Sequence, residues 1–217
     1  MIDVLIIGGG IAGVSAAAAL ARAARVTLVE AEDALGYHAS GRSAAMFEVN
    51  YGNDTVRALN RASEAAHIAA GVLSPRGILM VALASEVAAF ETDLEALGMA
   101  EMPVAEARRL VPILGPGVVR AALHQGASDI DTDRLLQGYA RAARGAGARI
   151  VTGARVEGIE RRGRWRVRCS DEDLEADVLV NAAGAWADGV AEMAGVAKLG
   201  LEPCRRSMAR LAAPGGP

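Results

Sequence analysis

The chain has 217 residues, of which 52% are hydrophobic and 23% are charged, and its formal net charge is −3. This length suits one large or two small domains with a buried core. Because basic and acidic residues are mixed along the chain, it lacks the basic stripe of nucleic-acid-binding proteins. Cys169 and Cys204, like the histidines His38, His67 and His124, are scattered, which argues against a metal site or a structural disulfide, and we expect a cytoplasmic protein.

Residues 4–21 carry no charge and nearly reach the length of a membrane-spanning helix. Glycines at positions 8, 9, 10 and 13 interrupt this stretch, so a strand, a tight turn and a helix explain it better than a membrane segment or a signal peptide. The apolar, β-branched run Ile2–Ile7 predicts a strand covered on both faces. An alanine-rich helix to about Ala24 follows, and then a second strand, Val26–Val29.

The glycines have the spacing G-x-G-x-x-G between that strand and that helix. Gly8 permits the tight turn, Gly10 lets a pyrophosphate approach the backbone, and Gly13 allows the helix and strand to pack closely. The helix N-terminus offers free N–H groups to phosphates. Glu30, at the end of the second strand, is placed to accept hydrogen bonds from the ribose hydroxyls, which disfavours NADP. The sequence therefore predicts a dinucleotide site for FAD or NAD.

Residues 36–52 read GYHASGRSAAMFEVNYG, where an ordinary NAD domain would continue with another short βαβ unit. We expect Ser40 to cap a short helix that starts near Arg42, with Arg42 or Ser43 reaching a phosphate oxygen. Small side chains here would let a flat ring system lie close to the backbone. A surface loop with a solvated arginine is the alternative reading.

The rest of the chain alternates between helical and strand patterns. Helices are predicted at Asn53–Ala70, Glu86–Leu97, Val104–Leu110 and from Asp131; strands are predicted at Gly77–Leu83, Val118–His124, Arg149–Thr152, Val178–Asn181 and Leu201–Leu211. Alternation over residues 154–169 predicts a small antiparallel meander. Residues 182–184 form a turn of low bulk whose N–H groups can face phosphate. Arg205 and Arg206 would point to opposite sides of the last strand, so one could reach an active site.

The first strand, GGGIAG, Glu30 and GYHASGRSAA together resemble the glycine/D-amino-acid oxidase superfamily of FAD enzymes. Downstream, ASDIDTDRLLQGYARAARGAGARI (127–150) resembles its helix leading into a third parallel strand, and ADVLVNAAGAWAD (176–188) resembles its strand and loop over the FAD phosphates. LSPR (73–76), DIDTD (129–133), VNAAGAW (180–186) and RRS (205–207) resemble the bacterial D-arginine dehydrogenase type of D-amino acid dehydrogenase.

The resemblance implies an α/β fold with two domains. A Rossmann-like, parallel-sheet FAD-binding domain would comprise residues 1–72 and 128–198. An inserted, incomplete α+β substrate domain would comprise residues 73–127 and 199–217. Together with the glycine motif, the resemblance assigns FAD contacts to Gly8, Gly10, Ile11, Ala12, Gly13, Glu30, Ala31, Ser40, Arg42, Ser43, Ala44, Ala45, Val156, Ala182, Ala183, Gly184 and Trp186.

The implied reaction is oxidation of the CH–NH bond of a D-amino acid by hydride transfer to FAD, with Tyr51, Arg206 and Met46 at the active site. Met46 stands where the D-arginine type has a histidine. Ile78 follows LSPR and Gly77, where that type places a carboxylate. An apolar residue cannot pair with a cationic substrate, so these departures favour apolar or small D-amino acids.

The relatives continue well beyond residue 217, so the chain looks C-terminally truncated, and we expect impaired catalysis and weak FAD retention. An oligomer or a complementing chain is therefore possible as a partner. Three alternatives remain: a superfamily enzyme for a 2-hydroxy acid, sarcosine or glycerol 3-phosphate; a non-catalytic FAD-binding module or half of a split complex; and, least favoured, an NAD enzyme.

Overall fold

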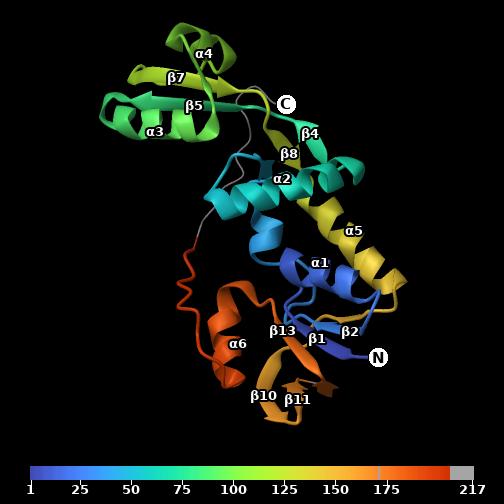
Figure 1. Cartoon of the computed structure of the whole chain (residues 1–217). Coiled ribbons are helices and arrows are strands. Elements are labelled where there is room, and N and C mark those ends of the chain that lie inside the picture. Colours follow the sequence, from blue (N-terminus) through green and yellow to red (C-terminus); the bar gives the residue numbers. More distant parts are fainter. Residues whose placement is uncertain (171, 206–217) are drawn as a thin grey trace. The chain divides into compact units, whose positions relative to one another are not determined.

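The computed structural model describes residues 1–170 and 172–205 (Figure 1). These residues form two compact units. Unit 1 comprises Met1–Ser43 together with the described residues from Thr132 onward, and unit 2 comprises Ala44–Asp131. Residues 44–72, which the sequence analysis assigned to the FAD-binding domain, lie in unit 2. The division into an FAD-binding domain and a substrate domain stays a prediction.

Unit 1 is built on a parallel four-stranded sheet in the order β13-β1-β2-β9. The strands are β1 (Asp3–Ile7), β2 (Arg25–Val29), β9 (Arg149–Val151) and β13 (Val178–Asn181). β1 lies between β13 and β2, with Val4 opposite both Val178 and Val26. This arrangement confirms the prediction of an α/β fold with a Rossmann-like parallel sheet, including β9 as its third predicted strand.

Each face of this sheet is covered, which explains why its strands are mostly apolar. Helices α1 (Ile11–Leu20) and α5 (Thr132–Gly145) cover one face (Figure 1). A meander of β10 (Val156–Arg162), β11 (Arg164–Cys169) and β12 (Asp173–Ala176), together with α6 (Ala187–Met193), covers the other. Side chains buried in the two resulting cores include Ile6, Val14 and Leu28 on the helical side and Leu5, Val29 and Val167 on the meander side.

Two elements predicted from the sequence differ from those observed in unit 1. α1 stops at Leu20 instead of about Ala24, because a turn must return the chain to the sheet, where the Arg25 N–H donates to the Ile2 carbonyl. Residues 201–205 form no strand, and residues 206–211 of that predicted strand, with Arg206, lie outside the described residues.

Unit 2 contains two antiparallel three-stranded sheets. One has the order β3-β8-β4, from Met46–Phe47, Ser128–Ile130 and Leu73–Pro75. The other has the order β5-β7-β6, from Ile78–Leu83, Val118–His124 and Ala100–Met102. The short strands β3, β4, β6 and β8 were not predicted, because two or three residues carry no readable period.

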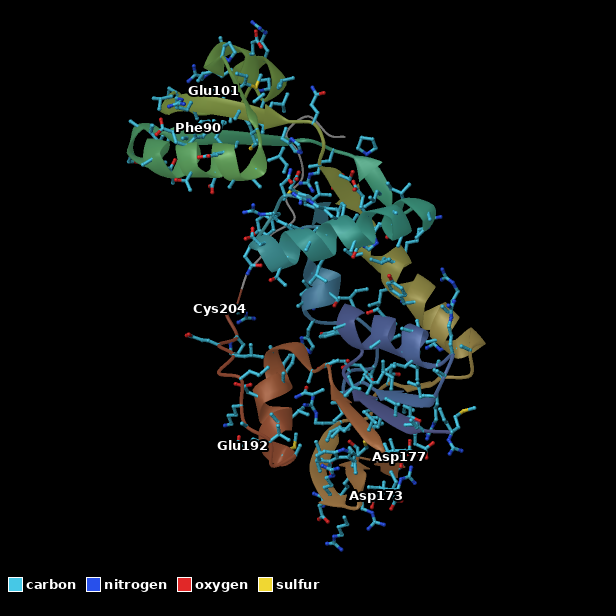
Figure 2. The ribbon with its side chains drawn as sticks, viewed as in Figure 1. Phe90, Glu101, Asp173, Asp177, Glu192 and Cys204 are labelled. Atoms are coloured by element: carbon cyan, nitrogen blue, oxygen red, sulfur yellow. The ribbon has the colours of Figure 1, made fainter. Side chains whose placement is uncertain are left out.

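Three helices complete unit 2: α2 (Asp54–Ala69), α3 (Val87–Leu97) and α4 (Val104–Leu110). Phe90 projects from α3 toward the sheet and is buried with Ala82, Met99 and Ala122 (Figure 2). Asn53 caps α2 by accepting a hydrogen bond from the Val56 N–H at 3.0 Å. No residue of α2, all of which is described, is fully buried. Among the described residues, no helix combines the length and apolar composition needed to span a bilayer.

Candidate functional site

The glycine loop between β1 and α1 is shaped first by the protein's own packing. Gly8 has φ +115°, and a side chain there would overlap the Ala182 carbonyl. A side chain on Gly13 would overlap the Gly8 carbonyl oxygen. Gly10 differs, because the nearest atom to an added Cβ is the Ser40 hydroxyl oxygen at 3.2 Å, a side-chain atom that can rotate away. The loop is therefore closed by backbone at Gly8 and Gly13 and bounded by a movable hydroxyl at Gly10.

The start of α1 presents hydrogen-bond donors beside this loop. The Ile11 N–H donates to the Ser40 hydroxyl at 2.9 Å. The N–H groups of Ala12 and Gly13 have no hydrogen-bond partner within residues 1–170 and 172–205. Ile11 and Ala12 are exposed, whereas Gly13 is buried. Donors of this kind at the positive end of a helix suit a phosphate, so the geometry fits the diphosphate of the expected cofactor.

The Glu30 carboxylate lies against the same loop. One of its oxygens accepts the Gly9 N–H at 2.6 Å, and the other accepts the Glu32 N–H at 2.8 Å. These two bonds fix the carboxylate, and each oxygen keeps a lone pair that can accept a ribose hydroxyl. Ala31 is half-buried between the two glutamates.

Residues 36–43 form a loop that is tied to the glycine loop. The Gly36 N–H donates to the Gly9 carbonyl at 2.9 Å, and the Ser40 hydroxyl reaches α1. The predicted helix starting near Arg42 is wrong: Arg42 ends a short 3-10 turn, Ala39–Arg42, that carries no cap from Ser40. Ser40 serves α1 instead, a through-space contact that local spacing could not indicate. Ser43 is the last residue of unit 1 before the division between the units.

Arg42 is occupied by its own loop. Its Nε donates to the Tyr37 carbonyl at 3.2 Å, and its guanidinium carbon lies 5.2 Å from the centre of the Tyr37 ring. The side chain is exposed, so it must leave these contacts in order to reach a phosphate. Its predicted role toward the cofactor therefore stays a prediction.

The turn after β13 approaches the glycine loop from the other side. The Ala182 N–H donates to the Ile7 carbonyl at 2.8 Å, which places the Ala182 carbonyl beside Gly8. Gly184 has φ +55° with open space around it, and Trp186 is exposed. The Val156 residue, at the start of β10, is half-buried in the same unit.

The remaining predicted site residues that the structure describes belong to unit 2. Ala44 and Met46 are exposed, Ala45 has an unusual positive φ of 56°, and the Tyr51 side chain is 60% exposed. Arg76, from the LSPR motif, donates to the Ala44 carbonyl at 3.3 Å and to Asp129 at 2.8 Å. The motifs LSPR and DIDTD are thus joined through the pairing of β4 with β8, which their separation in sequence concealed.

Sequence reasoning missed Glu48, the one charged residue that is fully buried among those the structure describes, at 4% exposed. Its Oε1 accepts the Asn50 N–H at 2.9 Å, and Oε2 lies 2.9 Å from Nε2 of His124. The latter is a close charge contact when the imidazole is protonated, but its direction is poor for a hydrogen bond. Asn60 donates to the carbonyls of both Glu48 and Tyr51, so the turn that carries Tyr51 is held from several sides. A carboxylate within the otherwise apolar run MFEV (46–49) was the available signal.

Two curated relatives are similar to this chain over most of its length. The chain is 29% identical over 213 residues to human mitochondrial dimethylglycine dehydrogenase, covering 89% of this chain and 24% of that protein. It is 28% identical over 227 residues to one component of the anaerobic glycerol-3-phosphate dehydrogenase of Escherichia coli K12, covering 95% of this chain and 41% of that component. The chain therefore spans less than half the length of these curated relatives.

The fold is shared with the FAD-bound L-alpha-glycerophosphate oxidase of Mycoplasma pneumoniae, at a TM-score of 0.78 and 22% identity over 89% of this chain and 57% of that one. The family of FAD-dependent oxidoreductases designated DAO matches residues 3–217. The prediction of FAD as the cofactor is thereby confirmed. Matched over nearly its whole length, the chain belongs to the DAO family of FAD-dependent oxidoreductases.

Proposed function

We propose that this chain forms the FAD-binding part, and a portion of the substrate-binding part, of an enzyme that oxidises the CH–NH bond of D-amino acids, with apolar side chains preferred. The observation that carries this proposal is the cradle in unit 1, where the exposed start of α1, the fixed carboxylate of Glu30 and the glycine loop are brought together. A bound FAD supplies a two-electron acceptor.

The residues of unit 1 would hold the cofactor by position. The N–H groups of Ala12 and Gly13 would bind the diphosphate, and the Ser40 hydroxyl would turn toward it from the Ile11 N–H. Glu30 would accept the ribose hydroxyls with its remaining lone pairs. The low-bulk turn Ala182–Gly184 would let the backbone approach the cofactor closely.

The substrate preference is inferred from unit 2. Ile78 is half-buried at the start of β5, and Met46 is 40% exposed in β3. Neither can neutralise a cationic side chain, so D-leucine or D-methionine should be better substrates than D-arginine. Tyr51 would close over the substrate, and Arg206, which lies outside the described residues, would face the active site.

The test begins with the visible spectrum of the purified protein, followed by anaerobic titration with D-leucine, D-methionine and D-arginine. Yellow protein that is bleached first by the apolar D-amino acids supports the proposal. The variant Ile78→Glu should shift bleaching toward D-arginine, whereas Val119→Glu, which adds the same charge at an exposed site of β7, should not. A wild-type preference for D-arginine would refute the proposed specificity.

A second candidate substrate class is favoured by the relatives, whose names give dimethylglycine and glycerol 3-phosphate. We infer that the same titration, extended to dimethylglycine, sarcosine, a 2-hydroxy acid and glycerol 3-phosphate, separates these classes. Bleaching by one of them alone would replace the D-amino acid assignment. Yellow protein that no substrate bleaches would indicate a non-catalytic FAD-binding module or half of a split complex.

A further inference from the structure

A row of ring contacts joins two of the loops around the cradle in unit 1. The His38 ring lies 4.5 Å from the Trp186 ring, at an interplanar angle of 55°. Tyr37 packs edge-on against His38, with the ring centroids 5.1 Å apart and an interplanar angle of 83°. Arg42 continues the row over the Tyr37 ring. We call these four residues the ring ladder.

Glu32 connects the ring ladder to Glu30, which is another part of the cradle. Nε2 of His38 lies 3.0 Å from Oε1 of Glu32, and the Glu32 N–H donates to the Glu30 carboxylate. Arg155 approaches the same Glu32 oxygen at 3.9 Å. His38 is thus held both by a hydrogen bond to Glu32 and by the ring contact with Trp186.

Burial alone does not explain these contacts. Tyr37 is 51% exposed and Trp186 is 53% exposed, so neither ring belongs to one of the two cores of the unit. Their segments, however, contain residues that meet the glycine loop: the Gly36 N–H donates to the Gly9 carbonyl, and the Ala182 carbonyl lies beside Gly8. A contact between His38 and Trp186 therefore fixes the spacing of two segments that both approach the diphosphate position.

We propose that His38 is a positioning residue for FAD, which holds the loop 36–43 and the turn 182–186 at the separation that the cofactor requires. This inference rests on the cofactor site described under the proposed function. The imidazole combines a planar face for Trp186 with a ring nitrogen for Glu32, and no other single side chain offers both at this size. Removing both features should weaken FAD binding more than removing either one.

Three variants separate the two features. His38→Phe keeps a ring and loses the nitrogen, His38→Gln keeps a polar group that can reach Glu32 and loses the ring, and His38→Ala loses both. FAD affinity, measured by calorimetric titration of the apoprotein, should fall about tenfold for His38→Ala, and the other two should recover part of that loss. Arg161→Gln is the matched control, since it removes the contact of Arg161 with the Trp165 ring at 5.1 Å in the meander.

A second measurement, the fluorescence of Trp186, detects the contact between His38 and Trp186 in the absence of FAD. Trp165 and Trp186 are the two tryptophans of the chain, so in a Trp165→Phe background the emission comes from Trp186 alone. Replacing His38 should change the intensity of this emission and leave the midpoint of thermal unfolding within a few degrees. A purely structural role would lower that midpoint and the FAD affinity together, in all three variants alike.

The outcomes are distinct. FAD affinity of His38→Ala equal to that of the wild type, or lowered no more than in Arg161→Gln, overturns the inference and leaves the cofactor site intact. Graded loss in the order expected, with a changed Trp186 emission, supports it. A wild-type protein that binds neither FAD nor ADP refutes the cofactor site itself, and with it the role of His38. If His38→Ala does not fold, the Phe and Gln variants decide between these results.

Discussion

The two units of this protein achieve order by different means. In unit 1, large branched side chains such as Leu5, Ile6 and Leu28 are almost fully buried on both faces of a parallel sheet. In unit 2, the hydrophobic cluster around Phe90 is small, and α2 buries none of its residues fully. Unit 2 instead contains a buried carboxylate, Glu48, and the polar contacts of Arg76 with Ala44 and Asp129. Packing therefore dominates in the unit that carries the cofactor cradle, whereas directed polar contacts contribute more in the other.

The largest expected effect tests the packing of unit 1. In Gly13→Ala, the added methyl group would overlap the Gly8 carbonyl, so α1 must move away from β1. We expect the free energy of unfolding to fall by roughly 3 kcal/mol and FAD binding to be lost. The matched control is Gly138→Ala in α5, where an added Cβ meets nothing within 4 Å. Gly138→Ala should raise the free energy of unfolding by about 0.5–1 kcal/mol. Urea unfolding at pH 7 measures both, and equal stability of the two variants would contradict the packing argument.

The next effect tests the polar contacts of unit 2. Glu48→Ala leaves the Asn50 N–H and His124 without their carboxylate. The free energy of unfolding should fall by about 2 kcal/mol. Glu64→Ala, at an exposed position of α2, should change it by less than about 0.5 kcal/mol. Chemical denaturation with tyrosine and tryptophan fluorescence provides the values. Similar losses in both variants would show that burial of Glu48 contributes nothing specific.

A smaller effect, dependent on pH, comes from Asp188 in unit 1. The N–H of Leu199 and, less strongly, those of Leu201 and Gly200 donate to its carboxylate and lower its pKa. Because the folded-state pKa lies below the unfolded one, this stabilisation is present above the unfolded value near 3.9 and is lost as the pH falls through the folded value. Asp188→Asn should therefore unfold at a lower temperature than the wild type at pH 7, and the gap should narrow below about pH 4. A gap that stays constant down to pH 2 would argue against this linkage.

The smallest effect concerns the positive φ of Ala45 in unit 2. Ala45→Gly relieves about 1 kcal/mol of backbone strain, but it raises the entropy of the unfolded chain, which costs about 0.4–1 kcal/mol. The net change should be close to zero. Ala44, the neighbouring residue, has no positive φ. Ala44→Gly should therefore only lose stability, through the higher entropy of the unfolded chain. The informative quantity is the difference between the two variants in thermal unfolding; no difference would mean that Ala45 is unstrained.

Most of unit 1 was predictable because its signals are local. The apolar runs, the glycine spacing and the acid at position 30 follow one another within thirty residues, and the structure places β1, α1 and β2 accordingly. The helices of unit 2 were also predicted, from Asn53, Glu86 and Val104 onward, within one or two residues of their observed bounds. The short strands of unit 2 were missed because their pairing depends on partners far along the chain.

The candidate site shows the same division. Glycines 8 and 13 are required by steric contacts that the spacing alone indicates. Ser40, by contrast, was expected to cap its own helix, whereas it binds the Ile11 N–H, 29 positions away. The partners of His38 and Glu48 are likewise set by segments that are distant in sequence and meet in space, and no periodic pattern encodes such a meeting.

By itself, the sequence determined the parallel-sheet framework and the kind of ligand it accepts, because backbone sterics at glycine and the period of apolar residues act over a few neighbouring positions. Only the tertiary structure decided which side chains occupy the cradle, join its loops and bury a charge in unit 2. Those choices depend on distances between segments that are remote in the chain, and packing of the whole unit fixes such distances.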